Sequence, residues 1–198
     1  MSIMEREFVV RAKSGDLEAF NALFAMEQKY IFNLVLHLTG DRDQADDLTQ
    51  ETLLTAYRNI RQFRGESRFR TWLTRIALNL FRREWRRRPP HVSICLEQIP
   101  ASTNEDQPER MIIKRELQWC ILHSLQQHVP KAYRMALVLR DLQNYSYREI
   151  SRILGWSLGK TKTSIHRGRR ILLAHFVNGK CHAFAKYNLC ICDGILEL

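Results

Sequence analysis

The sequence predicts an all-α protein made of two helical modules, joined by a flexible linker and followed by a short cysteine-rich tail. Three observations predict this fold class. Apolar residues recur at helical spacing through most of the chain. Only 8 glycines and 5 prolines occur in 198 residues, which favours long helices over a many-stranded sheet. Prolines gather between the two helical regions, where the helical periodicity is lost.

These breaks predict a first domain over residues 1–88, a linker over 89–108, a second domain over 109–177 and a tail over 178–198. The net charge of +10 suggests a polyanionic partner, either nucleic acid or an anionic membrane surface. No apolar run approaches the roughly 18 residues that a membrane span needs, and the N-terminus shows no secretory signal. We therefore expect no membrane span and a cytoplasmic location. An odd count of 5 cysteines argues against a disulfide framework.

The first module begins its main helical pattern after a break at Gly15 and Asp16. Seven apolar residues then fall on one helical face: Phe20, Leu23, Phe24, Ile31, Leu34, Val35 and Leu38. Gly40 follows the last of them and is typical of a residue that ends a helix.

The next helical pattern covers residues 43–60 and has two different sides. Its inward stripe contains Ala45, Leu48, Thr52, Ala56 and Ile60. Its other side contains Asp46, Asp47, Gln50, Glu51 and Leu54. The ordinary interpretation of the second set is a solvated acidic face. In so basic a chain, a compact acidic patch beside an exposed leucine favours a docking surface for another protein.

The third helical pattern carries most of the positive charge. Residues 58–88 contain 11 arginines against Glu66 and Glu84, a local net charge of 11 − 2 = +9. The apolar side contains Phe69, Trp72, Leu73, Ile76, Ala77, Leu80 and Phe81. A second stripe contains Arg68, Arg75, Asn79, Arg82 and Arg86. Arginine binds phosphates in a bidentate manner and stacks on bases, and only Glu84 interrupts the stripe. We therefore prefer nucleic-acid contact to a merely solvated basic face.

The second module ends in a predicted helix-turn-helix. Ser146 and Glu149 form a capping-box pattern that opens a short helix, Gly155 makes the turn, and Ser157 caps a second helix. The pair is expected to pack through Ile150, Leu154, Leu158, Thr161 and Ile165. The beginning and outer side of the second helix are expected to present Lys160, Lys162, Ser164, Arg167 and Arg169. A helix-turn-helix places its base-reading residues there, in the major groove.

Three segments, in this order and spacing, resemble the motifs of bacterial sigma factors of the extracytoplasmic-function type. The resemblance extends over nearly the whole chain, to about Val177. Residues 43–60 resemble the polymerase-docking helix, FRGESRFRTWLTRIALN the promoter-melting segment, and SYREISRILGWSLGKTKTSIHRGRR the second DNA-binding motif. The melting motif is intact apart from a one-residue shift at its first Phe-Arg-Gly. Trp156 stands where an aliphatic residue is usual, Lys160 where threonine is, and Thr161 where valine is.

The resemblance implies that the acidic helix docks on core RNA polymerase. It implies that the first module captures the non-template strand of the promoter's −10 element and that the second reads the −35 duplex. Phe63 and Asn79 match residues that line a pocket for a flipped-out base, under the loop from Gly65 to Arg70. The expected DNA-contacting residues are Phe63, Arg68, Arg75, Asn79, Arg82, Arg83, Arg86, Ser157, Lys160, Lys162, Ser164, Arg167 and Arg169. Phe69 and Trp72 fit core packing better.

Two other classes of protein compete with this interpretation. A stand-alone helix-turn-helix regulator would explain the second module but leave the acidic helix and the melting motif without a role. A nuclease would need clustered acids for metal, and only Asp46, Asp47 and Glu51 offer them. No phosphate-binding loop, HExxH motif or nucleophile elbow is present, so we expect a non-catalytic subunit. Core RNA polymerase and promoter DNA are the expected partners. An anti-sigma factor is a further candidate partner.

The tail beyond Val177 contains Cys181, His182, Cys190 and Cys192, and Cys95 of the linker is a further candidate ligand. Thiolates and imidazole suit zinc, copper or cadmium, and some sigma factors of this type carry cysteine-rich extensions that respond to metal. Incidental thiols and a redox switch are the alternatives. Cys120 lies in a helical pattern and is expected in the core. The core function itself requires no cofactor.

Overall fold

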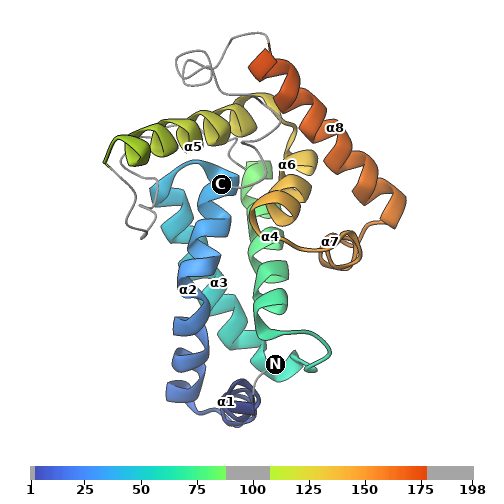
Figure 1. Cartoon of the computed structure of the whole chain (residues 1–198). Helices are drawn as coiled ribbons and strands as arrows, with labels where there is room; N and C mark the ends of the chain where they lie inside the picture. The colour runs from blue at the N-terminus through green and yellow to red at the C-terminus, as the bar shows by residue number, and fades with distance from the viewer. Residues whose placement is uncertain (1–2, 88–107, 178–198) are drawn as a thin grey trace. The chain divides into compact units, whose positions relative to one another are not determined.

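The computed structural model describes residues 3–87 and 108–177, and both ranges are built from helices joined by short turns (Figure 1). This confirms the predicted all-α fold. None of the described helices is long and apolar enough to cross a membrane. The elements in chain order are α1 (Ile3–Lys13), α2 (Leu17–Thr39), α3 (Arg42–Asn59), the 3₁₀ turn η1 (Ile60–Gln62), α4 (Phe69–Arg87), α5 (Pro108–His128), α6 (Lys131–Leu137), the π-type turn η3 (Val138–Leu142), α7 (Tyr147–Leu154) and α8 (Leu158–Val177).

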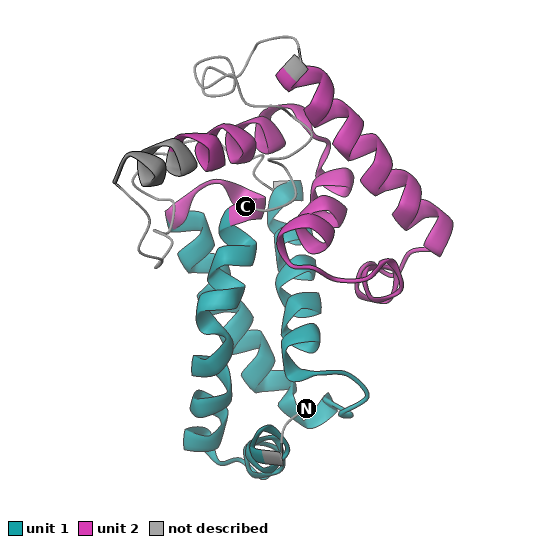
Figure 2. Cartoon of the chain, viewed as in Figure 1, with its two compact units in different colours: residues 1–36, 43–90 teal, residues 37–42, 91–198 magenta. Residues whose placement is uncertain are grey.

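The chain divides into two compact units, coloured separately in Figure 2. Unit 1 comprises residues 1–36 and 43–90, and unit 2 comprises residues 37–42 and 91–198. The division near residue 90 lies close to the start of the predicted linker. The grouping of residues 37–42 with unit 2 was not anticipated from the sequence.

Unit 1 has a core that follows the predicted apolar faces. In α2 the six predicted core residues of this unit, from Phe20 to Val35, are all buried. In α3 the predicted inward stripe is buried together with Thr49. Thr49 and Thr52 satisfy their hydroxyls by donating to the carbonyls of Ala45 and Leu48, at 2.7 and 2.6 Å. These bonds let two polar side chains share an otherwise apolar interface.

An aromatic cluster links the end of η1 to the start of α4. The ring of Phe63 lies 5.8 Å from Phe69 and 5.2 Å from Trp72, and the rings of Phe69 and Trp72 are 5.7 Å apart, centroid to centroid. Phe69 is buried, as expected for a core residue. Tilted and edge-to-face aromatic pairs at these separations add to the free energy gained from burial. The cluster fixes the point at which the chain leaves the loop and enters α4.

Local signals begin and end α2. Asp16 accepts the backbone N–H of Ala19 at 3.0 Å, as an N-cap residue does. This bond and the Arg11 guanidinium hold the pKa of Asp16 below its usual value. Gly40 has φ of +70°, the left-handed conformation predicted for the residue after the helix.

Unit 2 packs α8 against α5, α6 and α7. Gly168 allows close approach to α6, because a Cβ at this position would lie 2.7 Å from Cδ1 of Leu137.

Arg134 of α6 is buried and donates to the carbonyls of Gln126 and Val129, at 2.6 and 3.3 Å. Burial lowers the pKa of Arg134 to about 10. Cys120 is buried in α5, as expected.

The helix-turn-helix has the predicted caps. Ser146 accepts the backbone N–H of Glu149 at 3.3 Å, and the Glu149 carboxylate accepts the Ser146 N–H at 2.8 Å, which completes the capping box. Gly155 ends α7 with φ of +66°, and the Trp156 N–H donates to the Ser151 carbonyl at 2.9 Å. A residue with a Cβ would be strained at such a φ.

The interface between α7 and α8 agrees with the prediction at four of five positions. Ile150, Leu154, Thr161 and Ile165 are buried. Leu158, the first residue of α8, is 39% exposed, so it is not buried like the other four.

Candidate functional site

The outer side of α3 is acidic and exposed, as the sequence predicted. Asp46, Asp47 and Gln50 are exposed, and Glu51 is half-buried. Leu54, an apolar residue, is 51% exposed in their midst. An exposed leucine among carboxylates provides both the apolar area and the charge that a protein interface uses.

Tyr57 extends this acidic face and was missed by the sequence analysis. It is 42% exposed, and its ring packs edge-on against Phe20 with centroids 5.1 Å apart. It follows Leu54 by three residues and Gln50 by seven, so helical spacing alone places it on the same side. Tyrosine is enriched in protein interfaces, which strengthens the assignment of this face to docking.

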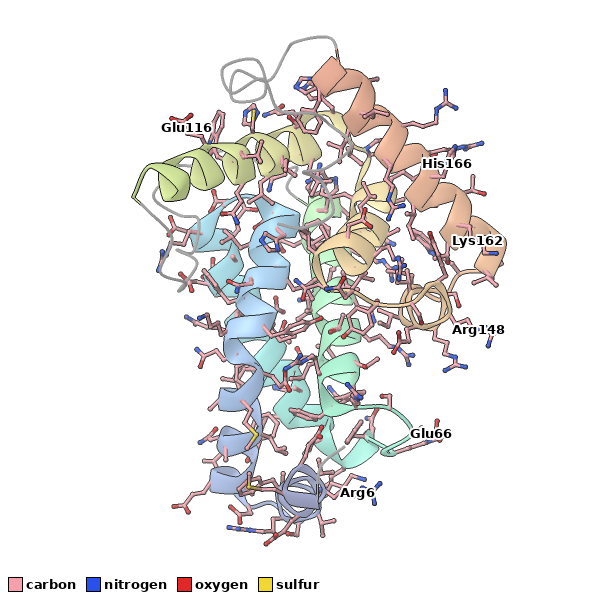
Figure 3. The ribbon with its side chains drawn as sticks, viewed as in Figure 1. Arg6, Glu66, Glu116, Arg148, Lys162 and His166 are labelled. Atoms are coloured by element: carbon pink, nitrogen blue, oxygen red, sulfur yellow. The ribbon has the colours of Figure 1, made fainter. Side chains whose placement is uncertain are left out.

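The predicted basic stripe lies on the outer side of α4 and on the residue just before it. Of the stripe, Arg68, Arg75, Asn79 and Arg86 are exposed, whereas Arg82 is half-buried. Arg83, a predicted DNA contact next to the stripe, is also exposed. The loop before α4 is exposed from Arg64 to Arg68, and Glu66 points outward from it (Figure 3). The stripe is therefore accessible along the described part of α4.

Arg82 interacts with two other residues of the stripe, Asn79 and Arg86. Its Nη1 donates to the side-chain carbonyl of Asn79 at 3.1 Å, which orients the Asn79 amide. Burial, and next the positive charge of Arg86 one turn away, lower the pKa of Arg82. Like charges at this spacing destabilise a helix. A bound polyanion would relieve this repulsion.

Arg83 connects the basic stripe with the acidic face, because its guanidinium forms an ion pair with the Glu51 carboxylate. Both side chains remain partly exposed. The pair joins Glu51, a predicted polymerase contact, with Arg83, a predicted DNA contact. No signal in the local sequence indicated it, since the two residues are 32 positions apart.

Phe63 is only 2% exposed, so its ring is not accessible as a base-stacking surface in this structure. It packs inside the aromatic cluster with Phe69 and Trp72. Asn79, its proposed companion in a base pocket, is exposed. The two predicted pocket residues thus differ in accessibility, and their joint role in binding a base stays a prediction.

The outer side of α8 forms a second basic surface. Lys160, Lys162 and Arg167 are exposed, and Lys162 points outward in Figure 3. Ser157 caps the helix by accepting the Lys160 N–H at 3.2 Å. Arg167 donates to the Tyr133 hydroxyl at 3.4 Å. The helix therefore presents cationic donors from a fixed N-terminus.

Two residues expected on this outer side have other surroundings, and we correct their placement. Ser164 is 4% exposed, because it lies in helical phase with the buried Thr161 and Gly168. Arg169 is half-buried and forms an ion pair with Asp141, whose carboxylate raises the pKa of Arg169. Arg169 therefore takes part in holding α8 to η3.

Between Lys160 and the end of the basic run at Arg170, three exposed residues of α8 were not predicted: Thr163, His166 and Arg170. His166 points outward beside Lys162 in Figure 3. Together with Gly159, these residues recur at intervals of three and four, so they lie on one face of the helix. The helical spacing could therefore have predicted their exposure. They complete the outer surface of the helix between Lys160 and Arg170.

The predicted metal ligands Cys95, Cys181, His182, Cys190 and Cys192 all lie outside the described residues. Among the side chains that the structure describes, no group of three or more histidine, cysteine or acidic residues is arranged to hold a metal ion. Metal binding by the tail therefore stays a prediction from the sequence.

Family comparisons match both units. Residues 23–89 match the model of sigma-70 region 2, and residues 121–172 match that of sigma-70 region 4. The first match contains α3, α4 and their acidic and basic faces. The second contains the helix-turn-helix.

Curated relatives cover most of the chain. The RNA polymerase sigma-H factor of Pseudomonas aeruginosa is 31% identical over 177 residues, which make up 85% of this chain and 91% of that protein. The ECF RNA polymerase sigma-E factor of Escherichia coli is 32% identical over 181 residues, which make up 86% of this chain and 93% of that protein. Among solved structures, CnrH in complex with the cytosolic domain of CnrY has a TM-score of 0.65 at 23% identity, covering 88% of this chain and 98% of that one.

Proposed function

The chain belongs to the extracytoplasmic-function family of RNA polymerase sigma factors, and we propose that its two units divide promoter recognition between them. As a sigma factor it directs RNA polymerase to promoters and is itself non-catalytic. Unit 2 reads the −35 duplex, and unit 1 binds the −10 element as it opens. A stand-alone regulator and a nuclease are set aside, because the relatives match both units.

The observation that carries this proposal is the capped, outward-facing α8. Lys160, Lys162 and Arg167 are exposed on a helix whose N-terminus is fixed by Ser157. A helix-turn-helix inserts this part of its second helix into the major groove. Base edges there present donors and acceptors that differ between base pairs, so a rigid set of donors selects a sequence.

The role proposed for unit 1 rests on charge. Single-stranded DNA binding combines a cationic path for the backbone with surfaces for unstacked bases. The exposed arginines of α4 supply the path, and the mutual repulsion of Arg82 and Arg86 favours binding of a polyanion. Asn79, oriented by Arg82, is the exposed candidate for contact with a base.

Core RNA polymerase is the partner proposed for the acidic face of α3. Asp46, Asp47, Gln50 and Leu54 are exposed there, opposite the stripe that packs into the unit. In this proposal, the sigma factor brings the −10 and −35 elements to RNA polymerase only when the polymerase is bound to this acidic face. The proposed site of action is accordingly the cytoplasm.

An anti-sigma protein is a further proposed partner. One similar solved structure holds CnrH in complex with the cytosolic domain of CnrY, and another holds the sigma factor RpoE in complex with the anti-sigma factor NepR from Bartonella quintana. These similarities concern the fold. The exposed acidic and basic faces of this chain are surfaces that such a partner would compete for.

Metal control by the tail is proposed from the sequence alone. The test is to titrate the reduced protein with zinc, copper or cadmium and to measure the metal stoichiometry and the metal-dependent transcription. The same measurements are made on four variants in which Cys95, Cys181, Cys190 and Cys192 are replaced singly by serine. Unchanged stoichiometry and unchanged metal-dependent transcription in all four variants would remove the proposal.

The main proposal is tested by run-off transcription with purified core polymerase on a library of promoters. We expect initiation only with the sigma factor present and only on a subset with two separated elements. Initiation that ignores the −35 sequence would contradict the role given to unit 2. Tight duplex binding without polymerase would support the stand-alone regulator instead.

A further inference from the structure

Trp156 and Lys160 form a contact at the entrance to α8. The Lys160 Nζ lies over the Trp156 ring, 4.7 Å from its centroid. Trp156 is half-buried and Lys160 is exposed. The separation lies within the range of a cation–π interaction, in which the negative face of the ring attracts the ammonium.

The backbone on both sides of this contact is fixed. The Trp156 N–H donates to the Ser151 carbonyl at 2.9 Å, directly after the left-handed Gly155. The Lys160 N–H donates to the Ser157 hydroxyl at 3.2 Å. Both side chains therefore start from defined positions, and the ring limits where the lysine ammonium can go.

Lys160 is in an electrostatically unfavourable place. The N-terminus of a helix carries partial positive charge, which disfavours a cation in the first turn. The first turn of α8 contains no acidic residue to compensate. The Trp156 ring offsets part of this cost, and an acceptor from outside the protein would offset the rest.

We propose that Trp156 positions Lys160 to donate to a guanine in the major groove of the −35 duplex. The inference rests on the function proposed above for unit 2. Guanine presents two acceptors, N7 and O6, which suit a lysine ammonium. The ring lies on one side of the ammonium, and Lys160 is exposed, so the ammonium is accessible to an acceptor outside the protein. Lysine loses much rotamer freedom on binding, and a side chain already restrained by a ring loses less.

The test uses the full chain bound to core RNA polymerase and a promoter library with every −35 position randomised. Initiation frequencies are counted for each sequence. For the unaltered chain we expect a preference for guanine, on the order of tenfold, at one position. Lys160→Thr should abolish the preference at that position and leave the others as they are.

Trp156 is tested as a positioning residue by its effect on the same base. Trp156→Leu should lower the guanine preference to roughly threefold, because one exposed cation–π contact is lost. Trp156→Phe keeps a ring and should retain most of the preference. The double variant with Lys160→Thr should match Lys160→Thr alone, since the two residues act as one unit.

Lys162→Thr is the matched control, because it makes the same change two residues along the same exposed helix. It should leave the guanine preference that depends on Lys160 unchanged, because any base that Lys162 contacts lies at another position of the −35 duplex. Thermal unfolding followed by circular dichroism shows whether each variant keeps its helices. Trp156→Phe keeps the test valid if Trp156→Leu unfolds.

Four outcomes would overturn the inference. An even loss across the library in Lys160→Thr would mean that Lys160 contacts phosphate. An unchanged guanine preference in Trp156→Leu, or additive effects in the double variant, would deny the positioning role. Initiation by the unaltered chain that is independent of the −35 sequence would overturn the function proposed for unit 2 as well, which distinguishes that failure from the other three.

Discussion

The two units hold their cationic side chains in different surroundings. In unit 2, Lys160 rests on the Trp156 ring, Arg167 reaches the Tyr133 hydroxyl and Arg169 is paired with Asp141. In unit 1, Arg70 and Arg83 are paired with Glu27 and Glu51, and Arg82 donates to Asn79 one turn from the like charge of Arg86. Neighbours thus orient cations in both units, and unit 1 adds the higher concentration of charge, a net of 11 − 2 = +9 over residues 58–88.

This difference indicates two modes of binding. Oriented donors suit a duplex, whose base edges have fixed positions. Concentrated charge suits a flexible strand, where phosphate neutralisation and counterion release dominate affinity. Substitutions in unit 2 should therefore change sequence preference, and substitutions in unit 1 should change salt dependence.

The largest effect is expected from Arg82→Ala combined with Arg86→Ala. Each lost charged contact costs about 1.4 kcal/mol, so binding of single-stranded −10 DNA by the holoenzyme should weaken by on the order of 100-fold at low salt. The slope of log affinity against log salt should become shallower by about 1.4 for two phosphates. Fluorescence anisotropy over a salt series measures both. An unchanged salt slope would contradict the charge-based mode assigned to α4.

Arg167→Ala should have the next largest effect. If Arg167 reads a base edge, about 2 kcal/mol is lost at the preferred −35 sequence, or roughly 30-fold in initiation. The loss should be far smaller on sequences that differ at the contacted base. Competitive transcription on matched and mismatched promoters distinguishes the two cases. An equal loss on both would assign Arg167 to phosphate and weaken the contrast between the units.

Ser146→Ala should lower the free energy of unfolding of unit 2 by about 1 kcal/mol, because α7 loses its N-cap. Urea unfolding followed by the fluorescence of tryptophans monitors this change. Ser151→Ala is a suitable comparison, since it removes a hydroxyl from the same helix without touching the cap. Equal destabilisation by both substitutions would count against the cap as the cause.

The smallest effect is expected from Asp47→Lys on the acidic face of α3. Reversing one exposed charge at an interface should weaken association with core polymerase by roughly threefold, mainly through the association rate. Surface plasmon resonance measures this, with Glu7→Lys as the control because Glu7 is an exposed acid on α1. Similar losses for both would indicate a general charge effect and not a docking face.

Helical spacing and capping patterns predicted much of the fold. The buried stripes of α2 and α3, the capping box at Ser146 and the left-handed Gly155 all depend on residues within a few positions of one another. Local rules suffice for such features. The helices over residues 108–142 were not resolved individually from the sequence, because α5, α6 and η3 lack a comparably clear apolar stripe.

The candidate site was predicted less completely, for physical reasons. Arg169 was assigned to DNA, but its partner Asp141 is 28 positions away and meets it only in the folded unit. Ser164 was assigned to the outer side of α8 on its polarity, although its helical phase places it inward. Phe63 is enclosed by rings from α4. The contact of Arg169 with Asp141 carries no local signal, whereas the inward phase of Ser164 could have been inferred from its spacing of three residues from Thr161.

The ion pair between Glu51 and Arg83 couples the evolution of these two positions. One partner lies on the proposed polymerase face and the other on the proposed DNA face, so neither position can change charge without affecting its neighbour. An exposed pair contributes about 0.2–1 kcal/mol, enough for weak epistasis. In a mutational scan, Glu51→Arg alone and Arg83→Glu alone should each reduce fitness by more than the loss of the polymerase or DNA contact of that residue explains, because each also breaks the ion pair. The double variant, which restores the pair with its charges exchanged, should recover part of that loss. The two surfaces would then evolve as a coupled pair, even though they meet different molecules.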